Sequence, residues 1–380
     1  MQCVLCGTLS ELKALESNWR ELEHLCSDAL LPFQTYAWNS TWWAYFARSG
    51  TWRKDTMRIL SFRVDNKLVA IYPLFETSFG IGPFHPVGYI RPFGADPNLT
   101  EIRGPLALPE YLPMVLRWTV KFLMKQARLK STLHIIGPTA AVRAAEECFG
   151  DAKAGIHREV TNYVLPLYGD WEKFRTGLKR NIKESLRRCY NSLKRDGLEH
   201  DLQVFTETTA ILQNLPQFYF LHAKRAALKS TSVSHPDYFL EPRHRDFMKA
   251  VIEALNREAD GSCGAHLFCL RINGEMVAMR LAFRCKKEMY FYYSGYDPQY
   301  SQYSVMTTLL AESLKWCIEK GLQSANLSVG TDVSKTRWGP QDIAYLETHF
   351  VHASLRGRIS RVLLELKQRK ARRNRLTPAL

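Results

Sequence analysis

The sequence predicts an α/β (α+β) protein made of two similar units, each with a mixed central sheet flanked by helices. The chain has 380 residues, a length that two domains fill comfortably. Hydrophobic residues make up 46% of it, which is enough to form large cores. Stretches with helical and with strand periodicity alternate, and one hairpin pattern occurs twice. These observations indicate a duplicated domain.

The repeated pattern consists of a strand, a two-residue turn and a second strand. Residues 63–70 read RVDNKLVA and residues 271–278 read RINGEMVA, an offset of 208 residues. Asp65-Asn66 and Asn273-Gly274 are turn residues of the kind that short hairpins favour. The offset is too long for a solenoid repeat and fits a duplicated domain, although many unrelated hairpins share this pattern.

The first unit begins with helices, because apolar residues between positions 10 and 48 recur at helical spacing. The elements expected next are two strands within Met57–Phe75, a long loop region with short strands, rich in Gly and Pro, at 79–109, a helix at 110–130 and a strand at Thr132–Ile136.

The second unit starts near residue 160. We expect one long helix from Trp171 to Asp196, with an apolar stripe that packs on the body and a basic face that meets an anion or solvent. The remaining expected elements are helices at 208–228 and 243–258, strands at 265–272, 275–284 and 288–294, a helix at 304–320 that ends at Gly321, and a strand at 324–329. Trp338-Gly339-Pro340 is expected to end the unit. We place the domains at 1–155 and 156–350, followed by a basic amphipathic tail at 351–380.

The formal net charge of +15 implies an anionic partner. A basic amphipathic tail can lie on an anionic membrane or bind nucleic acid. No RNA-recognition or helix-turn-helix pattern accompanies it, so we expect peripheral membrane contact through the tail. Nucleic acid is expected only as tRNA, in one alternative given below.

The nine cysteines are scattered through hydrophobic stretches, so we expect reduced thiols in a cytoplasmic protein, with any membrane contact at the inner face. Cys3 and Cys6 have CxxC spacing, but no second pair or nearby His completes a zinc site, and we expect no metal. We expect no signal peptide and no membrane span, because no run of about 18 apolar residues occurs.

From His266 to Trp338 the order of motifs resembles the GNAT acyltransferase domain of the CelD/BcsL-like acetyltransferase group, which is close to the Fem peptidyltransferases. The motifs that carry the resemblance are Asn273–Ala278, Tyr293–Pro298, Tyr303-Ser304 at a helix start, Gly321 at its end, Ser328–Lys335 and, upstream, His222-x-x-Arg225. The resemblance implies tandem GNAT domains. It implies that the second domain binds acetyl-CoA or another acyl-CoA, and that the first is structural or binds the acceptor.

In a GNAT fold the donor's diphosphate lies on unpaired backbone N–H groups at the start of the helix after the central strand. The resemblance places this start at Ser304, with Ser294, Tyr303 and Lys335 as further donor-binding residues. The segment 299–304 lacks the glycines of the family, and side chains there crowd the approach to phosphate. A plain core helix, or a donor other than CoA, therefore stays open.

Acyl transfer needs a group that deprotonates the acceptor and a donor to the carbonyl oxygen. His222 is the candidate base, because imidazole titrates near neutrality, although a lone helical His is more often structural. Tyr296 and Asp297 lie where the strands are expected to splay. A backbone N–H there could bind the oxyanion, and Asp297 could orient the acceptor or act as base, but Asp-Pro is also ordinary turn chemistry.

Four further residues are candidates for substrate binding. Arg225 shares a helix face with His222 and could bind a carboxylate or phosphate of the acceptor. Gly330, Asp332 and Arg337 follow the last expected strand, at an edge that opens on a cleft in α/β proteins.

The resemblance implies transfer of an acetyl or acyl group from acyl-CoA to an amine or hydroxyl. The acceptor is then a small molecule, a polysaccharide or a cell-envelope precursor. One alternative is a Fem-like peptidyltransferase that uses aminoacyl-tRNA, with the basic helix and tail binding RNA. Another is a non-enzymatic basic interaction protein with a degenerate GNAT core.

Overall fold

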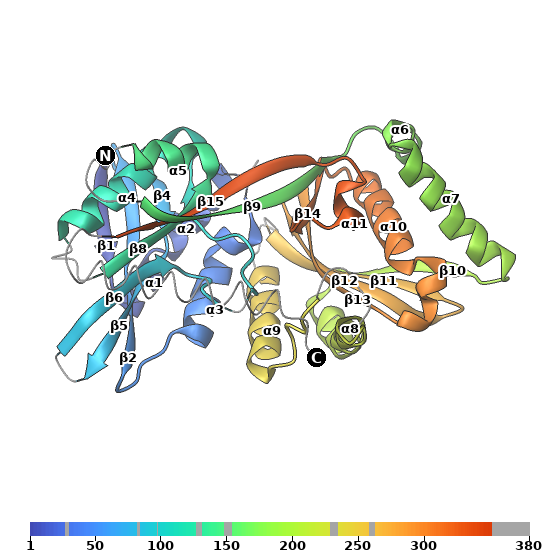
Figure 1. The fold of residues 1–380 in the computed structure, drawn as a ribbon, viewed down its shortest axis with the longest axis horizontal. Coiled ribbons are helices and arrows are strands. Elements are labelled where there is room, and N and C mark those ends of the chain that lie inside the picture. The colour runs from blue at the N-terminus through green and yellow to red at the C-terminus, as the bar shows by residue number, and fades with distance from the viewer. Residues whose placement is uncertain are drawn as a thin grey trace.

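The computed structural model describes residues 1–26, 30–81, 84–96, 98–126, 131–147, 154–228, 235–257 and 263–351. Within them the chain forms two α/β units side by side (Figure 1). The basic tail at 351–380 lies outside these residues except for its first position, and so does the membrane contact expected of it.

The helices and strands of the first unit follow the predicted order, with additions. They are β1 (Gln2–Cys6), α1 (Leu9–Ala14), α2 (Glu16–Leu25), α3 (Tyr36–Phe46), β2 (Arg53–Met57), β3 (Ile59–Val64), β4 (Lys67–Tyr72), β5 (Leu74–Ile81), β6 (Phe84–Pro92), β7 (Leu106–Ala107), α4 (Leu112–Gln126), β8 (Ser131–Pro138) and α5 (Thr139–Glu146). The loop region with short strands expected at 79–109 contains the end of β5 and the longer strand β6, which pair as a hairpin. Pro86 fits within β6 because β8 pairs only with residues 88–90, which leaves the proline at an edge.

The second unit also follows the predicted order. Its elements are β9 (Ala154–Pro166), α6 (Trp171–Gly177), α7 (Arg180–Arg195), β10 (His200–Phe205), α8 (Thr208–Ala226), α9 (Pro242–Asn256), β11 (Cys263–Ile272), β12 (Glu275–Cys285), β13 (Glu288–Tyr296), α10 (Val305–Glu319), β14 (Ser324–Val329), α11 (Val333–Thr336) and β15 (Gln341–Phe350). The single helix expected from Trp171 to Asp196 is interrupted, because Leu178 and Lys179 are extended after the poor helix former Gly177.

The duplication is confirmed by the turns of two hairpins. Asp65 and Asn66 both have left-handed backbone angles, with φ of 48° and 62°. Asn273 and Gly274 have φ of 50° and 83° at the corresponding positions. Two left-handed residues are what a type I′ turn requires, and its twist matches that of the flanking strands.

The strands of both units repeat in their pairing as well. The register shifts between residues 62 and 63 in the β3–β4 hairpin and between 270 and 271 in the β11–β12 hairpin. These shifts differ by the same 208 positions as the sequence repeat. Each unit also has one parallel strand pair, β6 with β8 and β13 with β14.

β9 and β15 join the two units into one sheet. β9 pairs antiparallel with β14 of the second unit, and β15 pairs antiparallel with β9 on one side and with β8 of the first unit on the other. Figure 1 shows the two long strands side by side across the molecule. The second unit therefore does not end at Trp338-Gly339-Pro340. The boundary placed between residues 155 and 156 falls inside β9.

The units also share a hydrophobic core. The Trp38 ring of α3 is fully buried and packs edge-on against Phe247 of α9 and Phe283 of β12, with ring centroids 5.6 Å apart in both pairs. α8 and α9 cover one face of the β11–β13 sheet, and α10 covers the other. This packing holds α3 of the first unit against α9 and β12 of the second.

Two further expectations concern the cysteines and the membrane. Cys263 and Cys285 face each other on paired strands and form a disulfide, so the expectation of reduced thiols is wrong for this pair. No helix in the described ranges has the length and apolar character needed to cross a membrane.

Candidate active site

A cavity of about 720 Å³ lies where β13 and β14 separate. The two strands pair in parallel only over Glu288–Tyr290 and Ser324–Asn326. Beyond these residues β13 carries a bulge opposite β12, which bends its end. The cavity is lined by the ends of both strands, the starts of α10 and α11, and residues from the irregular segment after β6.

Gly295 brings α8 against the end of β13. A Cβ on this residue would lie 2.2 Å from the amide nitrogen of His222 and 2.4 Å from the carbonyl carbon of Leu221. Any other residue would therefore push the helix away, since both contacts are with backbone atoms. This close approach carries Arg225, one turn along α8, to the cavity wall.

The start of α10 offers unpaired backbone donors. Ser304 is the N-cap residue, with left-handed angles of 52° and 43°, and its carbonyl oxygen accepts from the amides of Thr307 and Thr308. Within the described chain the amides of Val305 and Met306 have no acceptor outside the helix, and both residues line the cavity. A 3₁₀ helix, η3 (Pro298–Tyr303), occupies the place of a glycine-rich loop. The start of α10 can therefore hold an anion.

Two cations lie in the wall beside the strand ends. Burial, followed by the nearby Arg225, lowers the pKa of Arg280 to about 9, and Arg280 lies over the Phe291 ring at 5.5 Å. Burial, partly offset by Glu101, lowers the pKa of Lys335 to about 8, and its Nζ donates to the Val329 carbonyl. Two poorly solvated cations favour a ligand that carries or develops negative charge here.

Glu101 reaches this cavity from the first unit. Its carboxylate accepts hydrogen bonds from the Tyr290 hydroxyl at 2.8 Å and from the Ser328 hydroxyl at 2.9 Å. Burial raises the pKa of Glu101, although Lys335 and the two hydroxyls act against this. Ser328 has a φ of 68°, which costs a non-glycine residue energy and often marks a functional site. A carboxylate with a raised pKa in a cavity is a candidate proton acceptor.

Arg225 is held by two neighbours. It donates to the Ser294 hydroxyl at 2.8 Å and to Nε2 of His235 at 3.1 Å. Burial, followed by the charge of Arg225, lowers the pKa of His235 to about 4, so His235 is neutral and accepts this bond.

Burial would raise the pKa of Asp332, but bonds from Ser334 and the positive groups around it lower that pKa. Asp332 therefore stays ionised.

A second hollow lies along α7, beside the start of α10. Ser304 and Arg337 line both spaces. Arg188 and Arg195 line the outer hollow with polar residues of the same helix face. Part of the basic face of α7, which was expected to meet an anion or solvent, therefore borders a hollow that shares two lining residues with the cavity. Arg337 is oriented by a 2.6 Å bond to the Thr307 hydroxyl.

Most of the residues singled out from the sequence meet at this cavity. Those that line it are Arg225, Ser294, Tyr296, Ser304, Gly330, Asp332, Lys335 and Arg337.

Three others lie outside the cavity lining. His222 is buried behind the wall, where its Nδ1 donates to the Ser294 carbonyl at 3.1 Å, and burial lowers its pKa. Asp297 forms an ion pair with Lys224 at 2.6 Å and caps η3. The Tyr303 hydroxyl donates to Asp196. In this state neither His222 nor Asp297 touches the space that an acceptor would fill, and their catalytic roles stay predictions.

Sequence reasoning missed Glu101, Arg280 and His235, and it named Ser328 only as part of a motif, without a role. Arg280 had a signal, because it is a single charge within an otherwise apolar strand, residues 277–283. Glu101 had none, since it follows a stretch without periodicity and its partner Ser328 is 227 residues away. In the described ranges no cluster of three or more His, Cys, Asp or Glu side chains could hold a metal ion.

Comparison with known proteins agrees with this geometry. Residues 180–336 match the model of the acetyltransferase (GNAT) domain family. The solved structure of FemX is 12% identical and covers 91% of this chain and 97% of its own, with a TM-score of 0.53. L-PGS from Bacillus licheniformis is 13% identical and covers 94% of this chain and 96% of its own, with a TM-score of 0.49. No curated protein matches the sequence.

The match to the domain model covers the second unit from α7 to α11, and the first unit repeats its hairpin and its parallel strand pair. The likeness to FemX extends over both units and concerns the fold. The chain therefore has a tandem GNAT fold, and the cavity between β13 and β14 lies in the second unit with Glu101 of the first unit in its lining.

Proposed function

We propose that the protein transfers an acetyl or longer acyl group from acyl-CoA to an amine or hydroxyl acceptor. The observation that carries the proposal is the pair of unpaired amides at Val305 and Met306, which open into a cavity lined by Arg280 and Lys335. A diphosphate on the amides would leave the thioester end of the donor in the space between β13 and β14. The outer hollow with Arg188 would take the donor's remaining phosphate.

Proton transfer from the acceptor is assigned to Glu101. Its raised pKa makes it a stronger base than an exposed carboxylate, and the Ser328 hydroxyl holds it in place. As the acceptor nitrogen or oxygen bonds to the thioester carbonyl carbon, Glu101 takes its proton. Lys335 and Arg280 stabilise the negative charge that develops on the carbonyl oxygen.

The leaving group needs a proton when the carbon–sulfur bond breaks. Tyr296 lines the cavity and is the hydroxyl that we assign to this step. His222 then has a positioning role, because it fixes the Ser294 carbonyl beside Arg225. Asp297 would orient an acceptor amine once its ion pair with Lys224 opens.

The acceptor and the finer family are also proposals. Membership of the CelD/BcsL-like group rests on the motifs in Asn273–Ala278 and Ser328–Lys335. A polysaccharide or cell-envelope precursor suits a protein whose basic tail meets the inner face of the membrane. Arg225, Asp332 and Gly330 would contact this acceptor at the side of the cavity away from α10.

An aminoacyl-tRNA donor is the second candidate. The basic hollow along α7, next to the donor cavity, is the observation that favours it, because an RNA backbone would need such a surface. A non-enzymatic role is less well supported, since Glu101, Arg280 and Lys335 keep costly buried charges around an open cavity.

A donor assay tests the proposal. The purified protein is incubated with acetyl-CoA and a panel of amines and hydroxylated sugars, and release of free thiol is followed. We expect thiol release that depends on both acceptor and protein and that ribonuclease leaves unchanged. Activity that requires aminoacyl-tRNA and is lost on ribonuclease treatment would replace the acyl-CoA donor with the second candidate.

A further inference from the structure

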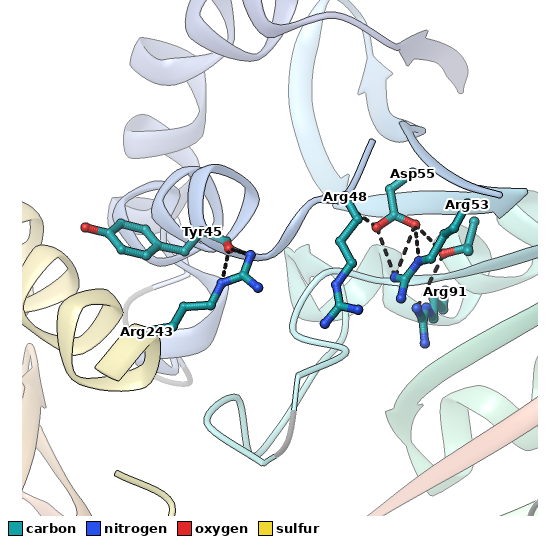
Figure 2. A network of polar contacts seen from close by, with 7 residues as sticks. Tyr45, Arg48, Arg53, Asp55, Arg91 and Arg243 are labelled. Atoms are coloured by element: carbon teal, nitrogen blue, oxygen red, sulfur yellow. Dashed lines mark hydrogen bonds and ion pairs between the residues drawn. The ribbon is translucent and has the colours of Figure 1, made fainter. Parts of the chain in front are cut away.

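Another cavity, of about 470 Å³, lies between the two units beside α3 and α9. We call it the arginine pocket, after the four arginines that line it: Arg48, Arg53, Arg91 and Arg243. Arg48 and Arg53 follow α3, Arg91 lies near the end of β6, and Arg243 lies in the first turn of α9 (Figure 2). None of them lines the cavity between β13 and β14.

Among these four arginines, only Arg53 forms an ion pair with an acid in the described chain. Arg53 Nη2 lies 3.0 Å from the Asp55 carboxylate. Asp55 also accepts from the Arg48 backbone amide at 3.0 Å and from the Thr77 hydroxyl at 2.6 Å (Figure 2). Asp55 thus pairs with Arg53, its charge also acts on Arg91, and the other three guanidinium groups form no ion pair in the described chain.

Arg91 is held rigidly without an acid partner. Its guanidinium lies 4.9 Å from the Phe75 ring centroid and 5.3 Å from that of Tyr89, and it donates to Thr77. Its buried Nε has no hydrogen-bond partner in the described chain. Burial, followed by the nearby Arg53, lowers the pKa of Arg91. A buried cation with an unused donor is costly, and an anion in the pocket would remove that cost.

The other two arginines complete the cluster. The Arg48 guanidinium is exposed and makes no hydrogen bond or ion pair within the described ranges, and in Figure 2 it extends to the same side of Asp55 as Arg91. Arg243 donates through Nε and Nη2 to the carbonyl oxygen of Tyr45, which carries no net charge. The three arginines of the pocket that form no ion pair within the described residues, Arg48, Arg91 and Arg243, thus come from three backbone segments.

The two remaining acids of the pocket do not balance this charge. Asp96 accepts from the indole of Trp42, the amide of Leu99 and the hydroxyl of Thr100, and these bonds tie its carboxylate to its own loop. Burial raises the pKa of Asp96, although the bonds from Thr100 and Leu99 act against this. Glu241 is exposed at the N-cap of α9.

We propose that the arginine pocket binds the phosphate group of a phosphate monoester. Guanidinium donors from three backbone segments around one cavity suit the tetrahedral oxygens of phosphate better than one planar carboxylate, which takes a single fork. A charge of about −1.5 to −2 at neutral pH matches the unpaired arginines. Phe46 and Phe75 also line the pocket, so an apolar or ring substituent on the ester has surface to pack against.

The arginine pocket is separate from the donor cavity, and a ligand bound there would have a different effect. A ligand held by Arg48 and Arg91 of the first unit and by Arg243 of the second would join the two units. The segment that leads into α9 carries His235 and Tyr238 of the donor cavity before it reaches Arg243. The proposal concerns binding alone and stands whether or not acyl-CoA is the donor.

Calorimetric titration of the full chain tests the proposal, with phenyl phosphate, inorganic phosphate and benzoate at one fixed ionic strength. We expect phenyl phosphate to bind, inorganic phosphate to bind more weakly and benzoate to bind weakest. Arg48→Met and Arg91→Met should each weaken phenyl phosphate binding about tenfold, as loss of one charge-assisted contact predicts. Arg48→Met guards against a folding defect, because the Arg48 guanidinium makes no bond in the described chain.

Two variants serve as controls. Arg58→Met removes an arginine that is paired with Glu76 and lies outside the pocket lining. Arg337→Met removes a cation of the donor cavity. Arg58→Met should bind phenyl phosphate as the unaltered protein does, and Arg337→Met should keep the binding that depends on Arg48 and Arg91. Absence of phosphate binding at millimolar concentration, equal affinity for benzoate, or a loss seen only in Arg337→Met would each overturn the proposal.

Discussion

The Ser328 hydroxyl at the end of β14 lies 2.9 Å from both carboxylate oxygens of Glu101, a residue of the other unit. This bond links a first-unit loop to the strand end where a GNAT-type site is expected. The first unit therefore supplies Glu101 to the wall of the cavity between β13 and β14.

Replacement of Glu101 by Gln tests the proposed base. An amide keeps the size and the bond to Ser328 but cannot take a proton, so we expect kcat to fall by about 100-fold or more with little change in KM. Because the pKa of Glu101 is raised, activity of the unaltered protein should rise with pH as Glu101 loses its proton. The variant should lack this dependence. Glu76→Gln, at a surface ion pair with Arg58, is the matched control. An unchanged kcat in Glu101→Gln would assign the base elsewhere.

Replacement of Arg337 by Met tests the path of the donor. Arg337 lines both the inner cavity and the outer hollow, so its loss should raise KM for acetyl-CoA about tenfold. The same variant should use a short acetyl thioester without phosphates as well as the unaltered protein does. An equal loss with both donors would mean that Arg337 acts through Thr307 and the fold.

Gly295→Ala tests the packing of α8 on β13. The added methyl would meet the backbone of His222 at 2.2 Å, so the helix must move and take Arg225 with it. We expect a loss of about 1–3 kcal/mol in the free energy of unfolding, together with reduced activity. Gly264→Ala, where the new Cβ meets its nearest atom at 3.4 Å, should cost less in urea denaturation. Equal costs would argue against the close contact.

Lys335 should make stability depend on pH in a defined window. Its folded pKa of about 8 lies below the ordinary value of 10.5. Between these values the folded protein binds fewer protons than the unfolded chain, so this contribution to stability increases as pH rises. The unaltered protein should gain stability relative to Lys335→Met between pH 7 and 9.5. A difference that stays constant over this range would show that Lys335 is not desolvated.

Leu346→Ala tests the strand exchange. Leu346 belongs to the last strand but is fully buried in the core of the first unit. Its truncation should lower the free energy of unfolding by about 2–5 kcal/mol. Ile343→Ala on the same strand, where the side chain is 39% exposed, should cost much less. A small effect of Leu346→Ala would contradict the pairing of β15 with β8.

The predictable parts of this fold are those fixed by neighbouring residues. The turns at Asp65-Asn66 and Asn273-Gly274 depend on left-handed residues within a few positions, and the end of α10 depends on Gly321. β9 and β15 were missed because they contain several polar residues and their partners come from both units.

The candidate site also has residues that the sequence could predict and residues that it could not. Residues of the Tyr293–Asp297 and Ser328–Arg337 segments were found because they follow recognisable strands. Glu101 and the arginine pocket depend on contacts between the two units. The hydrophobic periodicity within one unit does not predict such contacts. His222 was expected at the reacting atoms, but α8 turns its ring into the core behind Ser294.

The most direct test of the central claim is a thermal-shift titration with acetyl-CoA, longer acyl-CoAs, free CoA and ATP. A ligand that binds only the folded protein raises its melting temperature with concentration. We predict that the CoA species raise it, that ATP does so less, and that Arg337→Met reduces the shift. No shift with any CoA species would contradict an acyl-CoA site between β13 and β14.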